Sequence, residues 1–336
     1  MVRVDEILLR PQSLRNLFMA RSGSLPDLLF TPYQAEPSVS VQTDISMRYA
    51  VLADIHANIE ALTAVLSEVD RQGVDKIVCA GDLVGYYANP NECLDLIQKR
   101  QIDCVAGNHD RGARGDKAMR RSWEWARRAI VWTQKTLTQE NHAFLNQLPL
   151  VRSVDNQFLL VHAALHPEPN EETYLTQEDR VLESFEALRQ DHAPLRVCFF
   201  GHTHHPVVYA YRDGRLFSEV NHAVILAPDA CYLINPGSVG QSRDDDPRAS
   251  FLLFDAKEQQ IAFHRVSYDI KTPYRKAKAV GILYQEGQMH QFLDRSMTRV
   301  VTFFKKSRLL TRIVRGMKSR ARSLRARKRE EGRHAD

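Results

Sequence analysis

The chain has 336 residues, of which 43% are hydrophobic, and a formal net charge of +5. This is enough apolar sequence for a sizeable core in one large domain or two. No apolar run is long enough to span a bilayer, which excludes a membrane-spanning protein, and acidic residues at positions 5 and 6 argue against a secretory signal peptide.

The five cysteines are odd in number and form no Cys-x-x-Cys pair. Three of them lie within apolar, strand-like runs, so we interpret them as buried reduced thiols. Reduced thiols are typical of a reducing compartment. The cysteines therefore predict a cytoplasmic protein.

Basic residues concentrate in the C-terminal tail, residues 299–336, which carries fourteen lysines and arginines against three acidic residues. The tail has a net charge of +11, so the rest of the chain has a net charge of −6. Three interpretations stay open: a solvated, disordered charge run, an amphipathic helix at an anionic membrane surface, and a segment that docks on nucleic acid. The membrane alternative, based on an apolar face with Phe303, Phe304, Ile313 and Val314, would make the protein peripheral at the membrane.

Residues 1–46 contain four prolines and no sustained hydrophobic period, so we expect a poorly ordered N-terminal extension. Met47 stands directly before the first predicted strand and is an alternative to Met1 as the start of the protein.

The first half of the chain that follows residue 46 alternates strands and helices. Strands are predicted at 48–53, 76–80 and 102–106, and helices at 59–69, 89–97 and 120–148. This alternation is typical of βαβ units with a parallel sheet.

The second half is rich in strands. We predict strands at 157–161, 196–200, 207–211, 216–220, 232–234, 250–254 and 261–266, with a helix at 178–188. These strands should form a second sheet that faces the first. Residues 271–298 are predicted to be a helical appendage that leads into the basic tail.

Potential metal ligands follow several of the predicted strands directly. Strand ends are where ligands bind in open α/β sheets, so we expect these side chains to meet at one sheet edge. The candidate ligands are Asp54, His56, Asp82, Asn108, His162, His202 and His204. A set of carboxylates, imidazoles and an amide without thiolate suits a first-row divalent ion, with manganese as the first expectation and iron, nickel or zinc as alternatives.

Seven ligands are too many for one tetrahedral zinc ion and are enough for two ions that share one bridging carboxylate, for which Asp82 is the natural choice. Two such ions form a clamp for in-line displacement at phosphorus, with a bridging water acidified into the nucleophile. His109, next to Asn108, could point at the substrate and protonate the leaving group. Asp110 has two open interpretations, as the residue that orients His109 or as a helix N-cap.

These motifs resemble the five motifs of the calcineurin-like metallophosphoesterases. They are Asp54-x-His56, Gly81-Asp82, Gly107-Asn108-His109-Asp110, His162 and Gly201-His202-Thr203-His204, and Asn235–Gln241 resembles a loop of the small bacterial phosphodiesterase branch. The resemblance covers residues 47–270 and implies a four-layer α/β/β/α sandwich of two facing sheets. It also implies one metal ion on Asp54, His56, Asp82 and His204, a second on Asp82, Asn108, His162 and His202, and His109 as the leaving-group histidine.

The sequence departs from this branch at one position that affects the pocket. The branch usually has Gly-Ser after its lone histidine, whereas His162 is followed by Ala163-Ala164.

The expected function is a dinuclear-metal phosphodiesterase or phosphatase whose substrate and oligomeric state stay open. Two alternatives remain: a catalytically silent scaffold of the same fold, although no ligand is missing here, and a nuclease recruited by the basic tail, against which the negative charge of the remaining chain argues.

Overall fold

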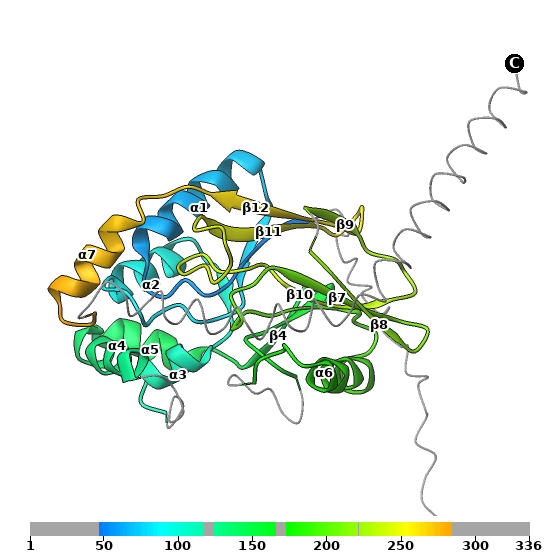
Figure 1. Ribbon diagram of the computed structural model, residues 1–336, viewed down its shortest axis with the longest axis horizontal. Coiled ribbons are helices and arrows are strands. Elements are labelled where there is room, and N and C mark those ends of the chain that lie inside the picture. Colours follow the sequence, from blue (N-terminus) through cyan, green and yellow to red (C-terminus); the bar gives the residue numbers. More distant parts are fainter. Residues whose placement is uncertain (1–46, 117–123, 166–172, 221, 284–336) are drawn as a thin grey trace, which may run out of the picture. The chain divides into compact units, whose positions relative to one another are not determined.

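The computed structural model describes residues 47–116, 124–165, 173–220 and 222–283. Within them, two six-stranded sheets lie face to face and helices cover the outer side of each sheet (Figure 1). This confirms the predicted four-layer α/β/β/α sandwich.

The first sheet has the strand order β3-β2-β1-β11-β12-β9. Its strands are β1 (Arg48–Leu52), β2 (Lys76–Cys79), β3 (Asp103–Cys104), β9 (Ala223–Ile225), β11 (Ala249–Asp255) and β12 (Gln260–Val266). Strands β1, β2 and β3 are parallel, as predicted, but β11 pairs antiparallel with β1, with Tyr49 opposite Phe254. The sheet is therefore mixed rather than parallel throughout.

The second sheet has the order β4-β5-β6-β10-β7-β8. Its strands are β4 (Val151–Val154), β5 (Phe158–Val161), β6 (Val197–Phe199), β7 (Val207–Arg212), β8 (Arg215–Glu219) and β10 (Cys231–Asn235). The expectation that the second half of the chain builds this sheet alone was wrong. The β11–β12 hairpin, which comes late in the chain, instead covers the free edge of β1, a pairing that hydrophobic alternation along a strand does not specify.

Seven helices are present in the described residues. They are α1 (Ile59–Gln72), α2 (Pro90–Lys99), α3 (Asn108–Ala113), α4 (Glu124–Thr136), α5 (Gln139–Gln147), α6 (Glu178–Asp191) and α7 (Lys271–Ala279). The single helix predicted within 120–148 is divided, because Thr138 adopts an extended conformation and its hydroxyl caps α5 at the N–H of Asn141. Helix α1 begins where predicted but extends beyond residue 69 to its C-cap at Gly73, whose φ of 63° lies in the left-handed region.

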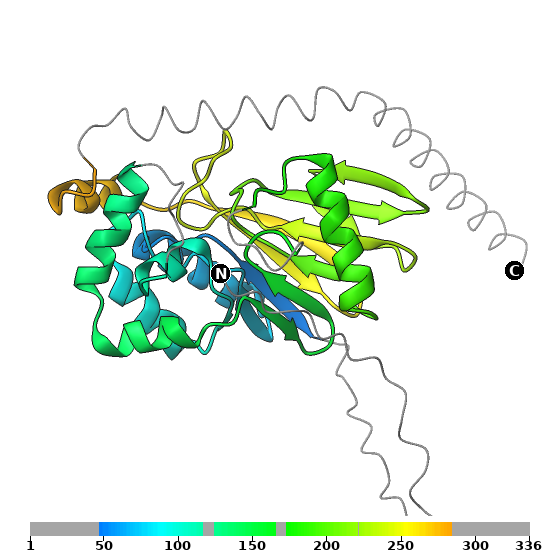
Figure 2. The same cartoon turned by 90° about the horizontal axis from the view of Figure 1, so that it is seen from below.

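Side chains along β1 alternate between two hydrophobic layers. Tyr49 and Val51 pack between the two sheets, whereas Ala50 and Leu52 face the helical layer that includes α1 and α2. Helix α6 covers the second sheet, and Figure 2 shows it as a green helix lying across the green strands. The two sheets are thereby held so that the carboxyl ends of β1, β2, β3, β5 and β6 supply residues to one site.

The predicted N-terminal extension and the basic tail lie outside the described residues, as does most of the predicted appendage, of which α7 is described. Within the described ranges, the helices are all too short or too polar to cross a bilayer.

Candidate metal centre

All seven predicted ligands lie buried together at the carboxyl ends of strands. Asp54 follows β1, Asp82 follows β2, Asn108 begins α3 after β3, His162 follows β5, and the last two histidines follow β6. They come from both sheets, so the expectation of a site along the edge of one sheet was wrong. Facing sheets allow ligands from two directions to enclose a site.

The backbone at the site is held in an unusual conformation. Five of the predicted ligands have φ angles in the left-handed region, between 53° and 65°: Asp54, His56, Asp82, His202 and His204. Each such residue costs about 1–3 kcal/mol and persists only where the surroundings enforce it. Backbone bonds between the loops do so here: Asp54 N donates to Gly81 O at 3.0 Å and His56 N to Asp82 O at 2.9 Å.

The first group of ligands is Asp54, His56 and His204. The Nε2 atoms of the two histidines lie 3.1 Å apart, and the Nε2 of His204 lies 3.4 Å from Asp54 Oδ1. Each ring can donate its Nδ1 proton to a backbone carbonyl, His56 to Val84 at 3.3 Å and His204 to Gln241 at 2.5 Å. With these tautomers, two unprotonated nitrogens face each other, an arrangement that a cation between them would stabilise.

The second group contains Asp82, His162 and His202, with Asn108 beside them. The His162 Nε2 atom lies 3.3 Å from Asp82 Oδ2 and 3.2 Å from Asn108 Oδ1, and its Nδ1 faces the carbonyl of Ala80 at 2.8 Å. Burial would lower the pKa of His162, but the charge of Asp82 raises it to about 9. A proton on His162 therefore balances this group when no cation does.

Asp82 lies between the two groups. Its Oδ2 atom is 3.6 Å from His56 Nε2 and 3.3 Å from His162 Nε2, and its Oδ1 accepts the backbone N–H of His109 at 2.9 Å. Burial would raise the pKa of Asp82, but the charges of His162 and His109 hold it well below its usual range. A Cβ at Gly107 would collide with this carboxylate, so glycine is required there. Asp82 is therefore within 3.6 Å of a histidine from each group.

Two buried polar atoms in these groups, Asp54 Oδ2 and His202 Nε2, have no hydrogen-bond partner among the described residues. Leaving a buried polar group unsatisfied costs about 1–3 kcal/mol, so such atoms normally have a ligand. Carboxylate oxygens and imidazole nitrogens suit first-row divalent ions. The residues present therefore fit two divalent ions, and the remote nitrogens that face carbonyls add the supporting contacts typical of metal-binding histidines.

His109 projects into the same region. Its ring lies 4.7 Å from that of His56 and 4.3 Å from that of Tyr86, and its Nδ1 is buried without a partner among the described residues. Burial lowers its pKa to about 4. A Cβ at Gly85, where φ is 89°, would collide with this ring, so the loop after β2 must have glycine to accommodate it.

The carboxylate of Asp110 accepts hydrogen bonds from backbone N–H groups. One carboxylate oxygen accepts the N–H groups of Leu83 at 2.9 Å and Val84 at 3.1 Å, and the other accepts that of Gly107 at 2.9 Å. The N-cap of α3 is Gly107 and not Asp110, which is the third helical residue and accepts the N–H of the N-cap. Through these hydrogen bonds, Asp110 ties the loop after β2 to the start of α3, the two segments that present Asp82 and Asn108.

The loop Asn235–Gln241 is also built into the centre. The Ser238 hydroxyl and the Gly240 N–H both donate to the Asp54 carbonyl, at 2.8 and 2.9 Å. The Asn235 side chain donates to the carbonyl of Gly201 at 2.6 Å. This loop therefore orients ligands from two other segments.

Sequence reasoning missed three residues at the site: Tyr86, Tyr174 and Arg243. Tyr86 stacks on His56 at 4.1 Å, and Tyr174 lies 4.1 Å from His202. Arg243 donates to the His202 carbonyl and to the Tyr86 hydroxyl, each at 3.1 Å. Tyr86 ends the segment 81–86, which resembles the small bacterial phosphodiesterase branch, but no pattern of ligand-like residues indicated a role for any of the three.

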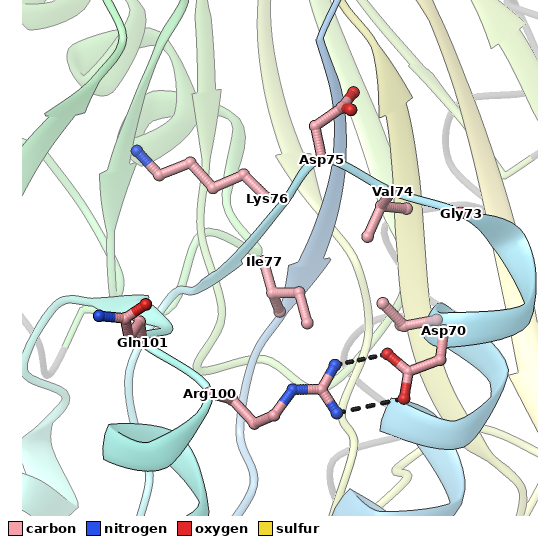
Figure 3. Close-up of a pocket in the computed structure, with 9 residues that line it drawn as sticks. Asp70, Gly73, Val74, Asp75, Lys76, Ile77, Arg100 and Gln101 are labelled. Atoms are coloured by element: carbon pink, nitrogen blue, oxygen red, sulfur yellow. Dashed lines mark hydrogen bonds and ion pairs between the residues drawn. The ribbon is translucent and has the colours of Figure 1, made fainter.

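A pocket of about 430 Å³ lies at the amino end of β2, away from the ligands that follow its carboxyl end (Figure 3). Its two basic side chains are paired with carboxylates, Arg100 with Asp70 at 2.5 Å and Lys76 with Asp103 at 3.0 Å. Among the described residues, no group of potential metal ligands lines this pocket; these groups lie at the other end of the strands.

Metal binding should stabilise the protein measurably. An ion at 100 times its dissociation constant adds about 2.7 kcal/mol per site to the free energy of unfolding. We expect Mn²⁺ to raise the midpoint of thermal unfolding of the wild type and of the control His142→Ala, which changes a histidine on α5 outside the site. His204→Ala should show a smaller rise. An equal rise in His204→Ala would contradict the assignment of His204 as a ligand.

The sequence matches the calcineurin-like phosphoesterase superfamily domain over residues 47–259. It is 40% identical over 231 residues to an uncharacterized protein of Methanocaldococcus jannaschii. This match covers 68% of this chain and 90% of that protein. A metallophosphoesterase from Sphaerobacter thermophilus has a similar structure, with a TM-score of 0.59 and 32% identity, covering 75% of this chain and 99% of that chain. A hypothetical protein from Pyrococcus horikoshii OT3 shares the fold at 18% identity, with a TM-score of 0.57 and coverage of 73% and 97%.

Proposed function

The chain belongs to the calcineurin-like phosphoesterase superfamily, and we propose that it hydrolyses phosphoesters with two divalent metal ions, for which manganese is the first expectation. The observation that carries the proposal is the arrangement of buried acceptor atoms around Asp82, whose Oδ2 lies within 3.6 Å of a histidine from each ligand group. Atoms of this kind repel one another unless cations or protons lie between them.

Each ligand group would hold one ion, with Asp82 shared between them. When bound, two divalent ions would activate a water molecule as the nucleophile and neutralise the charge that develops on the phosphate oxygens. The loop Asn235–Gln241 and the backbone carbonyls that face the histidines would keep the ligand atoms oriented.

His109 is proposed as the residue that assists the leaving group. Its Nδ1 is buried without a partner among the described residues, so it is available to exchange a proton with a substrate oxygen. Its low pKa of about 4, caused by burial, leaves it neutral before substrate binds. The negative charge of a bound phosphoester would favour the protonated ring that a leaving alkoxide needs. Asp110, through the backbone of Gly107, would position this histidine rather than react.

Hydrolysis of an aryl phosphodiester, measured beside the matching aryl monoester with Mn²⁺ added, tests the function. We expect turnover of both, with the diester preferred, because the loop motifs resemble the phosphodiesterase branch. A chain ending at residue 298 should retain this activity, since the ligands lie between residues 54 and 204. Protein that binds metal but hydrolyses neither ester with any divalent ion would favour the scaffold alternative.

The basic tail stays a separate proposal, in which residues 299–336 bring the enzyme to an anionic partner. A net charge of +11 over this segment supports attraction to either an acidic membrane surface or nucleic acid. Flotation with phosphatidylserine liposomes separates the two, because only a membrane-binding tail would carry the full-length protein to the top of the gradient. Failure to bind either partner would leave the tail as a solvated charge run.

A further inference from the structure

Arg243 is a buried cation inside the candidate metal centre. Its side chain follows the loop Asn235–Gln241 and is only 2% exposed. One terminal nitrogen donates to the carbonyl of His202 and the other to the hydroxyl of Tyr86, both at 3.1 Å. These two bonds help to fix the guanidinium, on which a hydrogen bond with Tyr174 and the charge of Asp54 also act.

These two contacts place the guanidinium close to residues of both ligand groups. His202 belongs to the second group, while Tyr86 stacks on His56 of the first group with ring centroids 4.1 Å apart. The charge of Arg243 is also felt at the first group: after burial, it is the next largest cause that lowers the pKa of His204. Arg243 therefore lies beside the space that both groups enclose.

A buried charge is costly, and a fully desolvated guanidinium normally requires an anion nearby. The carboxylate of Asp54 interacts with this charge and supplies part of that compensation. Two divalent ions held by two carboxylates, Asp54 and Asp82, would leave the centre positive, and Arg243 adds one further positive charge. Such a centre attracts a multiply charged anion rather than a neutral ligand.

We propose that Arg243 binds the phosphoryl group of the substrate by donating hydrogen bonds to its non-bridging oxygens. A guanidinium has five N–H donors, so it can keep its bonds to His202 and Tyr86 while it donates to a phosphate. Its planar fork matches the spacing of phosphate oxygens better than a lysine ammonium does. This inference deepens the proposed function and rests on it, because it assigns a substrate-binding residue to the same centre.

Tyr86 is the positioning residue in this arrangement. Its ring is clamped between His56 and Trp125, with centroids 4.1 and 4.5 Å away, so its hydroxyl has a fixed place from which to accept the bond from Arg243. Tyr86→Phe keeps the stacked ring and removes only the acceptor. We expect it to weaken phosphate binding less than changes at Arg243 do.

The test measures binding of inorganic phosphate to full-length, Mn²⁺-loaded protein by calorimetry, together with bound metal by mass spectrometry. Charged hydrogen bonds are worth about 1.5–3 kcal/mol each, so Arg243→Gln should weaken phosphate binding by roughly 10- to 100-fold. Arg243→Lys keeps the charge but not the fork and should fall between. The matched control is Arg248→Gln, a half-exposed arginine on the same loop that is paired with Asp246 at 2.6 Å. The control should bind phosphate as tightly as the wild type, and the amount of bound metal should be the same in all variants.

Several outcomes would overturn the assignment. Arg243→Gln could bind phosphate as tightly as the wild type, or lose metal together with phosphate, which would make Arg243 a brace for His202. The wild type could also fail to bind phosphate at all. Phosphate binding that depends on Arg243 in a protein that hydrolyses no ester would support the assignment and contradict the proposed function. Hydrolysis that is unaffected in Arg243→Gln, with a Michaelis constant equal to that of the wild type, would contradict the assignment of Arg243 and support the proposed function.

Discussion

Asp82→Asn is expected to abolish turnover. The variant keeps the shape of the side chain but replaces a carboxylate, which lies between His56 and His162, with a neutral amide. Removing one partner from a buried charged group costs about 3–5 kcal/mol, equivalent to roughly a 10²- to 10⁴-fold loss of binding or rate. Because both ions would share this ligand, we expect both metal content and the rate of ester hydrolysis to fall.

The matched control is Asp103→Asn. Asp103 also pairs with basic side chains, Lys76 at 3.0 Å and Arg152 at 3.1 Å, but it is partly exposed and lies on β3 away from the ligands. Partly exposed pairs contribute little to stability, so turnover and metal content should match the wild type. Wild-type turnover in Asp82→Asn would exclude a bridging role for this carboxylate.

His109→Ala should lower kcat while leaving both metal ions in place. General acid catalysis contributes about 10²- to 10⁴-fold, and the loss should be largest for esters with poor leaving groups, because these need the proton most. Esters of an acidic phenol should lose much less. The measurement is kcat for a series of aryl and alkyl esters, with metal content determined on the same samples.

His205→Ala is the control for this experiment. His205 lies next to His204 in the chain, and its Nδ1 contacts the carbonyl of Thr203 at 2.8 Å, so it is a histidine beside the centre but outside the ligand groups. Its kcat values should follow those of the wild type across the series. If His109→Ala lost the same factor with every ester, His109 would be supporting the site and not protonating the leaving group.

The sequence placed the candidate ligands close together because their motifs are local signals that follow strands. Each ligand comes directly after an apolar strand, and the carboxyl ends of parallel strands must meet at one edge, so Asp54 and Asp82 could be placed together without a structure. The left-handed φ angles at these positions could not be predicted in this way. Non-glycine residues adopt them only because backbone bonds between loops, such as Asp54 N to Gly81 O, enforce them.

Sheet membership and Arg243 were beyond sequence reasoning for a different reason. The pattern of β11 specifies a buried strand but not the edge on which it pairs, and that edge is set by packing against β1. An arginine two residues after a loop is usually exposed. Its burial depends on Tyr86 and on His202, which come from distant parts of the chain.

A titration of metal-free, full-length protein with Mn²⁺ tests the dinuclear centre most directly, with bound metal and hydrolysis of the aryl diester followed on the same samples. We expect two ions to bind per chain and turnover to reach its plateau only when the second site is filled, because Asp82 lies close to both groups. Full turnover at one bound ion, or no turnover with both sites filled, would contradict this expectation.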